Sequence, residues 1–169
     1  MVALRRATPA DAAKLSLVGG ASFLESFAND HPGDDLVAHV AEGHSVAAYA
    51  AWLADPAYAL WIIEEAFGSP IGYAMLGPAT LPDAATGDLE LKRIYILYRW
   101  HGGGQGKTLF AAVQDEAKRR GARRLILAVY TANTQAQAFY ARQGMTVIGM
   151  TRFMVGSTGF DDLVMARAL

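Results

Sequence analysis

The chain contains no cysteine, which excludes disulfide bonds and any catalysis by a protein thiolate. It has only six prolines, and 53% of its residues are hydrophobic, a composition that excludes a disordered chain. No apolar run reaches the roughly 20 residues that span a bilayer, and the N-terminus lacks the basic and apolar regions of a signal peptide. The formal net charge of −1 gives no electrostatic reason to expect nucleic-acid or anionic-membrane binding.

These absences leave a compact protein of one domain, residues 1–169, because a single domain is usually about 100–200 residues long. We expect a cytoplasmic protein that binds a small molecule, with no nucleic-acid or membrane partner. His31, His39 and His44 are spaced irregularly and match no metal-binding motif, so we expect surface or loop histidines and no metal. The sequence leaves a homodimer open.

Periodicity places the secondary structure. Alternating or apolar runs predict strands at 2–6, 58–64, 71–76, 88–97, 123–130, 145–155 and 160–168, and helical spacing predicts helices at 9–27, 36–42, 45–54, 105–120 and 133–143. Residues 29–35 and 81–87 are polar and are expected to form loops. An antiparallel first half followed by a strand–helix–strand–helix second half predicts an α/β fold.

One stretch, Arg99 to Leu109 with sequence RWHGGGQGKTL, joins a predicted strand to a predicted helix. Glycines at such a join let backbone N–H groups approach a ligand closely, and the positive end of the helix dipole favours a phosphate. The run GKT at 106–108 matches the end of a Walker A loop, but His101 stands where that motif begins with glycine. The downstream strand 125–131 also carries no acid for Mg²⁺. A P-loop-like nucleotide binder is therefore an alternative of a different class.

The same loop resembles the pyrophosphate loop of the GNAT superfamily of acyl-CoA-dependent N-acetyltransferases, whose signature is Gln/Arg-x-x-Gly-x-Gly/Ala. The register from His101 through Gly104 to Gly106 fits the helix that follows, with histidine in the first position instead of glutamine or arginine. A second segment, NTQAQAFYARQGM at 133–145, resembles the family's N-x-x-A-x-x-F/L-Y-x-x-x-G-F segment at almost every fixed position.

The resemblance extends to residues 4–12 and 153–165, so that it covers roughly the whole chain. The tail and the segment LKRIY at 91–95 look like the spermidine/spermine-type branch. The family implies a GNAT fold, a mixed and mostly antiparallel sheet flanked by helices and splayed between strands that end near Ile96 and Tyr130. The thioester of acetyl-CoA, the implied co-substrate, would lie in that gap.

The resemblance also implies cofactor-binding residues. The pyrophosphate would lie on the loop and helix start, formed by His101, Gly102, Gly103, Gly104, Gln105, Gly106 and Lys107. A bulge would free backbone groups of Ile94, Tyr95 and Ile96 to bind the acetyl carbonyl and the pantetheine arm. Asn133 would contact the same arm, although an asparagine at a helix start also serves simply as an N-cap.

Two residues are candidates for proton transfer. In the family, the residue at the position of Tyr140 is the general acid that protonates the CoA thiolate, whereas an arbitrary helical tyrosine is more often core. An amine with a pKa near 10 is neutral in only about one molecule in 10³ at pH 7, so its attack on the thioester needs a base. Some relatives place a glutamate where this chain has Ala128, which makes Glu90 the replacement candidate; the alternative is that Glu90 is only a salt-bridge partner.

The acceptor amine is the least defined part of the prediction. The first two helices would form the acceptor wall, and Glu25, Phe27 and Tyr73 are the candidate substrate contacts. Acids beside aromatics suit a polyamine or another small amine acetylated by direct attack in a ternary complex. A protein or peptide N-terminus is the alternative acceptor, and a non-catalytic acyl-CoA-binding module is the alternative without enzyme activity.

Overall fold

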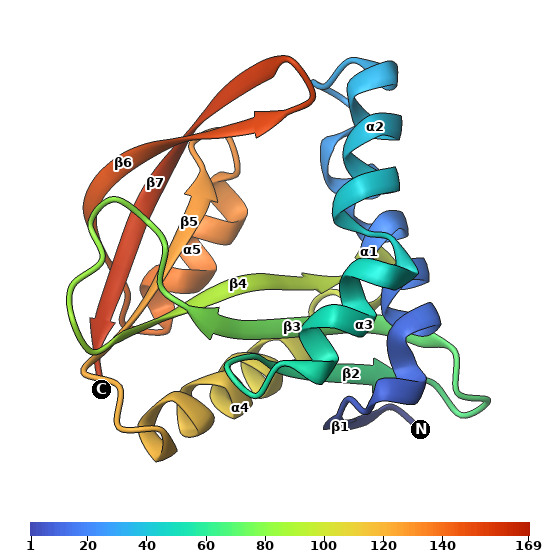
Figure 1. The fold of residues 1–169 in the computed structure, drawn as a ribbon, viewed down its shortest axis with the longest axis horizontal. Coiled ribbons are helices and arrows are strands. Elements are labelled where there is room, and N and C mark those ends of the chain that lie inside the picture. The colour runs from blue at the N-terminus through green and yellow to red at the C-terminus, as the bar shows by residue number, and fades with distance from the viewer.

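The computed structural model describes residues 1–169 as one sheet with helices on both faces (Figure 1). The strands are β1 (Ala3–Arg6), β2 (Ala59–Glu64), β3 (Pro70–Pro78), β4 (Asp88–Ile96), β5 (Arg124–Tyr130), β6 (Thr146–Val155) and β7 (Thr158–Ala168). The α-helices are α1 (Ala12–Phe27), α2 (Gly33–Gly43), α3 (Val46–Ala54), α4 (Gln105–Arg119) and α5 (Thr134–Arg142). Short 3₁₀ turns, η1 (Pro9–Asp11) and η2 (Tyr98–Trp100), precede α1 and the glycine-rich loop.

The sheet has the order β1-β2-β3-β4-β5-β7-β6, and it is divided in its middle. Every neighbouring pair is antiparallel except β4 and β5, which run parallel and pair only at Asp88–Arg124, Leu89–Leu125 and Glu90–Ile126. Beyond these pairs the two strands diverge, as Figure 1 shows. The splayed, mostly antiparallel sheet expected from the sequence is confirmed.

The two faces of the sheet bury separate cores because side chains alternate along each strand. On β2, Trp61 and Ile63 pack with α4, while Leu60 and Ile62 pack with α1 and α3. All six residues of β2 are therefore buried, which explains why this strand reads as a continuous apolar run in the sequence.

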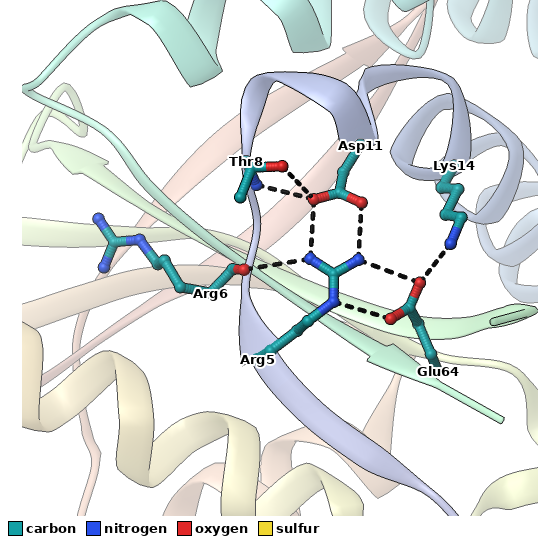
Figure 2. Close-up of polar contacts among 6 residues, drawn as sticks. All are labelled: Arg5, Arg6, Thr8, Asp11, Lys14 and Glu64. Carbon is teal, nitrogen blue, oxygen red and sulfur yellow. Dashed lines mark hydrogen bonds and ion pairs between the residues drawn. The ribbon is translucent and has the colours of Figure 1, made fainter. Parts of the chain in front are cut away.

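The edge of the sheet at β1 is tied to α1 by a charged network (Figure 2). The guanidinium of Arg5 donates to both carboxylate oxygens of Asp11 at 2.7 and 2.8 Å and to those of Glu64 at 2.8 and 3.1 Å. Lys14 donates to Glu64 at 2.6 Å, and the backbone N–H of Thr8 donates to Asp11 at 2.8 Å. These partners hold the pKa of Asp11 and of Glu64 below its usual range, the Arg5 hydrogen bond being the largest cause in each case.

The element boundaries follow the predicted ones, with one difference. Helix α2 begins at Gly33 and not at Leu36, so the predicted loop at 29–35 is too long. Pro32 fixes the residue before the helix, and Asp34 and Asp35 occupy its first turn, where carboxylates interact favourably with the helix dipole. None of the helices combines the length and apolar character that a membrane crossing needs.

Candidate active site

A cleft of about 930 Å³ opens where β4 and β5 separate. One side is formed by β4, the loop before α4, the end of β5, and α5; the other is formed by α1, α2 and the β6–β7 hairpin. Most of the residues predicted for the site line it: Glu25, Phe27, Glu90, Ile94, Tyr95, Ile96, His101, Gly102, Gly104, Gln105, Gly106, Lys107, Asn133 and Tyr140. Residues of four separate chain segments therefore meet in one cavity.

The glycine-rich loop has the backbone geometry of an anion site. Gly102 and Gly104 have φ of +81° and +84°, a conformation that residues with a Cβ adopt only with strain. Gly104 is the N-cap of α4, so the first backbone N–H groups of a 15-residue helix face the cleft with the positive end of its dipole. Lys107 adds a positive charge at the same edge.

Gly103 differs from its neighbours. It lines a small second cavity with Val2, Leu4 and Thr108, outside the main cleft. A Cβ at Gly103 would meet the end of the flexible Gln105 side chain at 2.5 Å, and that side chain would have to shift. Gly103 is thus absent from the lining of the main cleft, and its role in cofactor binding stays a prediction.

His101 occupies the first position of the loop motif and makes a specific contact there. Its Nε2 lies 2.7 Å from the backbone oxygen of Ile96, the last residue of β4. This hydrogen bond joins the loop to the end of the strand beside the cleft. The imidazole thus positions the loop relative to β4, which gives the departure from glutamine or arginine a structural role.

The edge of β4 that faces the cleft has no strand beside it after Glu90. On its other edge, Arg93 pairs with Met75 and Leu91 with Leu76, so Lys92 is the extra residue of a β-bulge. The backbone of Ile94, Tyr95 and Ile96 thus follows a bulge and lines the cleft. Apart from the Ile96 carbonyl, which is bound to His101, the outward-facing N–H and C=O groups on this stretch are free to bind a ligand in an extended conformation.

Tyr140 lies on α5, between the cleft and the core beneath α4. It is 8% exposed and packs against the rings of Phe110 and Phe139 at centroid distances of 6.4 and 5.4 Å. Burial, and secondarily the neighbouring Tyr95, raises the pKa of Tyr140 far above its usual value. The hydroxyl is therefore protonated at pH 7 and able to donate.

At the start of α5, Asn133 accepts a hydrogen bond from the backbone N–H of Ala136 at 3.0 Å, so its N-cap role is confirmed.

Glu90 lies at the point where β4 and β5 part, and its carboxylate already has partners. Lys92 donates to it at 2.9 Å and the backbone N–H of Thr80 at 2.8 Å. The salt-bridge alternative for Glu90 is thus confirmed, while its role as a base stays a prediction.

Among the acceptor candidates, Glu25 and Phe27 line the cleft, and Glu25 accepts a hydrogen bond from the backbone N–H of Tyr98 at 2.8 Å.

Tyr73 is not an acceptor contact. Its side chain is fully buried beneath α1, where its hydroxyl accepts a hydrogen bond from Tyr49 at 3.0 Å. The residue lies in the middle of β3, and the alternation of the strand turns it toward the helix layer and away from the cavity. That contact prediction was wrong because the sequence does not reveal how deeply a strand residue is covered.

The histidines also differ from expectation, because His31 and His44 are buried. Burial first, and the charge of Arg93 second, lowers the pKa of His44 to about 3, so its ring is neutral at pH 7. Its Nδ1 lies 3.0 Å from the hydroxyl of Tyr49, to which Arg93 also donates. The network joins β4 to the α2–α3 junction and has a structural role.

Among the charged residues of the cleft that sequence reasoning missed is a buried acid, Asp162 on β7. It is only 7% exposed, and its Oδ1 is buried without a hydrogen-bond partner. Burial first, and the neighbouring Asp161 second, raises the pKa of Asp162 to about 6. The alternation of Phe160, Asp162 and Val164 on a predicted strand was a usable signal, because it places an acid among inward-facing apolar residues.

Comparisons with known proteins agree with this geometry. The family model described as the acetyltransferase (GNAT) family matches residues 21–145. An uncharacterised N-acetyltransferase of Mycobacterium tuberculosis is 31% identical over 159 residues, covering 94% of this chain and 98% of the relative. A Bacillus subtilis protein, whose name assigns it alanine N-acetylation of ribosomal protein bS18, is 32% identical over 64% of this chain and 68% of its own length.

Among solved structures, the PaiA N-acetyltransferase of Thermoplasma acidophilum, crystallised with coenzyme A, has the same fold. The two structures superpose with a TM-score of 0.81, covering 100% of this chain and 99% of that one, at 18% sequence identity. The family model covers most of the chain, including the glycine-rich loop and all of α5. The protein therefore belongs to the GNAT family of acetyltransferases.

Proposed function

We propose that this acetyltransferase moves the acetyl group of acetyl-CoA to the primary amine of a small molecule, by direct attack within a ternary complex. The observation that carries the proposal is the single cleft into which an anion-binding loop, an unpaired strand edge and the hydroxyl-bearing Tyr140 all open. No enzyme nucleophile is needed, because an amine attacks a thioester directly once it has lost its proton.

Acetyl-CoA fits the cleft from the loop inward. Its pyrophosphate is assigned to the backbone N–H groups at the start of α4, with Lys107 and Arg142 as nearby cations. Its pantetheine amides are assigned to the free edge of β4 at Ile94 to Ile96, in the manner of an added strand. The Thermoplasma acidophilum protein of the same fold, crystallised with coenzyme A, supports coenzyme A as the ligand.

Tyr140 is assigned as the general acid. The departing thiolate requires a proton, and a buried phenol with a raised pKa holds one at pH 7. For the base, Glu90 is the candidate that the sequence offers. Its carboxylate is shared with Lys92 at 2.9 Å, so a proton from the acceptor would have to compete with an ammonium group already in place.

The acceptor end of the cleft favours a small amine over a peptide. Phe23, Leu36 and Val155 form a buried cluster that connects α1 and α2 to the β6–β7 hairpin. The hydroxyl of Thr158 in the hairpin also donates to Asp35 of α2 at 2.7 Å. These contacts join α2 to the β6–β7 hairpin beside the cleft, an arrangement that suits a small acceptor better than an extended peptide.

Within small amines, a polyamine is the finer proposal, because Glu25, Asp30 and Asp162 line the same cavity as several aromatic rings. A peptide N-terminus remains the second candidate on one observation, the name of the Bacillus subtilis relative.

The experiment is a thiol-detection assay of acetyl-CoA with spermidine, n-butylamine, lysine, an aminoglycoside and a peptide with N-terminal alanine. Release of CoA that depends on spermidine or another small amine supports the proposal, whereas release with the peptide alone replaces it with the second candidate. If no amine is acetylated while CoA raises the melting temperature, the protein is an acyl-CoA-binding module. A melting temperature raised by ATP and not by CoA identifies a nucleotide binder instead.

A further inference from the structure

Asp162 occupies the centre of the sheet half that closes the cleft. On β7 it pairs with Tyr130 of β5 on one side and Thr151 of β6 on the other. Directly opposed residues of neighbouring strands share a face, and all three of these residues line the cleft. The carboxylate of Asp162 is thus held by the sheet itself, opposite α1 and α2.

The carboxylate has no cation of its own. The nearest charges on β6 and β7 are Arg152 and Asp161, which are exposed and lie 3.9 Å from one another. Tyr130 of β5 is the directly opposed neighbour of Asp162, and Tyr95 of β4 lines the same cleft; after burial, the charge of Asp162 contributes to raising the pKa of each tyrosine. The other charged groups that line the cleft are the acids Glu25, Glu90 and Asp30, of which Asp30 is bound to His31 at 2.8 Å, and the cations Lys92, Arg93, Lys107 and Arg142.

An unpaired buried carboxylate is costly, and other buried acids of this protein avoid that cost. Asp88 receives two hydrogen bonds from Arg124, at 2.7 and 3.0 Å, and Glu90 receives one from Lys92. Neither carboxylate oxygen of Asp162 receives a hydrogen bond: Oδ1 is buried without a donor, and the residue lines the cleft. Asp162 is therefore a buried acid of the cleft whose charge no protein group balances.

The rings beside Asp162 indicate which chemistry supplies a donor. Phe160, two residues away on the same strand face, stacks on His31 at a centroid distance of 3.8 Å and meets Tyr130 edge-on at 5.5 Å. Phe27 lies 6.3 Å from Tyr130. Aromatic faces around a carboxylate favour an organic ammonium, because the rings attract the cation and cover its carbon chain.

Resting on the proposed function, we propose that Asp162 is the acceptor site of the cleft: its carboxylate binds the substrate ammonium and takes its first proton. The neutral amine then attacks the thioester carbon, the C–N bond forms and the C–S bond breaks. The thiolate takes the proton of Tyr140, which regains one from the amide nitrogen as it forms. Asp162 releases the first proton to solvent, so one ammonium and one acetyl-CoA yield one amide, one thiol and one proton.

Tyr95 links the two proton-transfer steps, at Asp162 and at Tyr140. After burial, the charge of Asp162 contributes to raising the pKa of Tyr95, and Tyr95 contributes to raising the pKa of Tyr140. Binding at Asp162 therefore brings the amine to the part of the cleft where β4, with its free backbone edge, faces α5. Glu90, at the parting of the strands and bound to Lys92, has a positioning role for β4 in this arrangement.

The test compares Asp162→Asn with Asp161→Asn, the adjacent exposed acid on the same strand. We expect Asp162→Asn to lower kcat/KM for the amine by about 10²- to 10⁴-fold, with CoA affinity changed less than about twofold. Its pH profile should lose the limb that the wild type shows near the pKa of Asp162, about 6. Asp161→Asn and Glu90→Gln should keep that limb, and Asp162→Glu should restore part of the rate.

A binding measurement covers the case in which no tested amine is acetylated, which would refute the proposed function alone. In protein labelled with ¹³C at the aspartate carboxyl, the resonance that Asp162→Asn removes is followed during a pH titration. With CoA bound, adding n-butylamine should lower its titration midpoint, since a cation favours the carboxylate. A titration midpoint that does not change when the amine is added would overturn the inference. So would kinetics in which Glu90→Gln loses the pH-dependent limb of kcat/KM while Asp162→Asn stays fully active.

Discussion

Two groups of buried carboxylates stand at opposite ends of one sheet and are treated in opposite ways. At the β1 edge, Asp11 and Glu64 share Arg5, and Lys14 also binds Glu64, so each acid in Figure 2 is joined to several donors. In the cleft, Asp162 is equally buried and has an oxygen with no donor. The pKa moves down in the first group and up in the second.

The difference indicates that paired and unpaired acids have different roles in this protein. The paired acids join β1, β2 and α1, so they fix the fold. The carboxylate of Asp162 connects no elements, and its ionisation makes the folded state less stable at neutral pH. Such a loss of stability is common at binding sites, where the bound ligand offsets it. Substitutions at the edge should therefore change stability, and substitutions in the cleft should change activity.

Beside the loss already predicted for Asp162→Asn, the largest effect is expected on the cleft side, from Tyr140→Phe. The change removes one hydroxyl and keeps the ring that packs against Phe110 and Phe139. Turnover should fall by roughly 10²-fold or more, because the thiolate loses its proton donor, while CoA affinity and melting temperature stay nearly constant. Steady-state kinetics and calorimetry check this; turnover within a few-fold of wild type would show that water is the donor.

The matching change on the edge side is Arg5→Ala, which leaves Asp11 with Thr8 alone and Glu64 with Lys14 alone. The guanidinium is 38% exposed, so solvent screens the loss, and we expect about 1–2 kcal/mol in the free energy of unfolding. Urea unfolding measures it, and acetyl-transfer rates of the folded variant should be unchanged. A stable but inactive variant would break the division between the two regions.

A smaller effect in the cleft is expected from Gly106→Val. A Cβ at this position would meet Phe139 at 3.5 Å and Ile96 at 3.7 Å, ordinary contact distances, so the fold tolerates the first added carbon. The larger side chain would stand on the surface assigned to the pyrophosphate. We expect about tenfold weaker CoA binding by calorimetry, with a melting temperature like that of Ala111→Val, an exposed control on the same helix. Equal losses of stability and CoA affinity would assign the glycine to packing.

The smallest predicted effect concerns salt. If spermidine is the acceptor, its apparent KM should rise a few-fold between about 50 and 500 mM NaCl, because mobile ions screen attraction to Asp162, Asp30 and Glu25. The KM of n-butylamine, which carries one charge, should rise less. A spermidine KM that does not respond to salt would contradict acid-guided binding of a polycation.

The comparison also separates what the sequence could predict from what it could not. The strand and helix order, the glycine-rich loop and α5 were predictable, because local periodicity and two spaced motifs carry them. The start of α2 at Gly33 was missed because glycine and two aspartates are typical of a loop, yet here they occupy a first helical turn.

The local sequence could not predict which buried acid would have hydrogen-bond partners. Glu90 and Asp162 both lie on apolar strands, but only the folded chain brings Lys92 and Thr80 to one and no donor to the buried oxygen of the other. The burial of Tyr73 and His44 likewise depends on the packing of α1 and α3 in the folded chain. Tyr73 is covered by residues of both helices, and His44 contacts Tyr49 of α3. Motifs locate the cofactor end of a cleft, whereas the acceptor end is set by long-range packing.

The most direct test of the division between the two regions is the free energy of unfolding of Asp162→Asn and Asp11→Asn, measured at pH 7 and pH 5. The carboxyl of Asp162 binds its proton more tightly in the folded state, so its ionisation opposes folding above its unfolded pKa of 3.8. We expect Asp162→Asn to be more stable than the wild type by about 2 kcal/mol at pH 7 and by about half of that at pH 5. Asp11→Asn should be less stable at both, because the depressed pKa of Asp11 stabilises the fold throughout this range. An Asp162→Asn protein destabilised to the same degree at both pH values would contradict the assignment of Asp162 to a ligand.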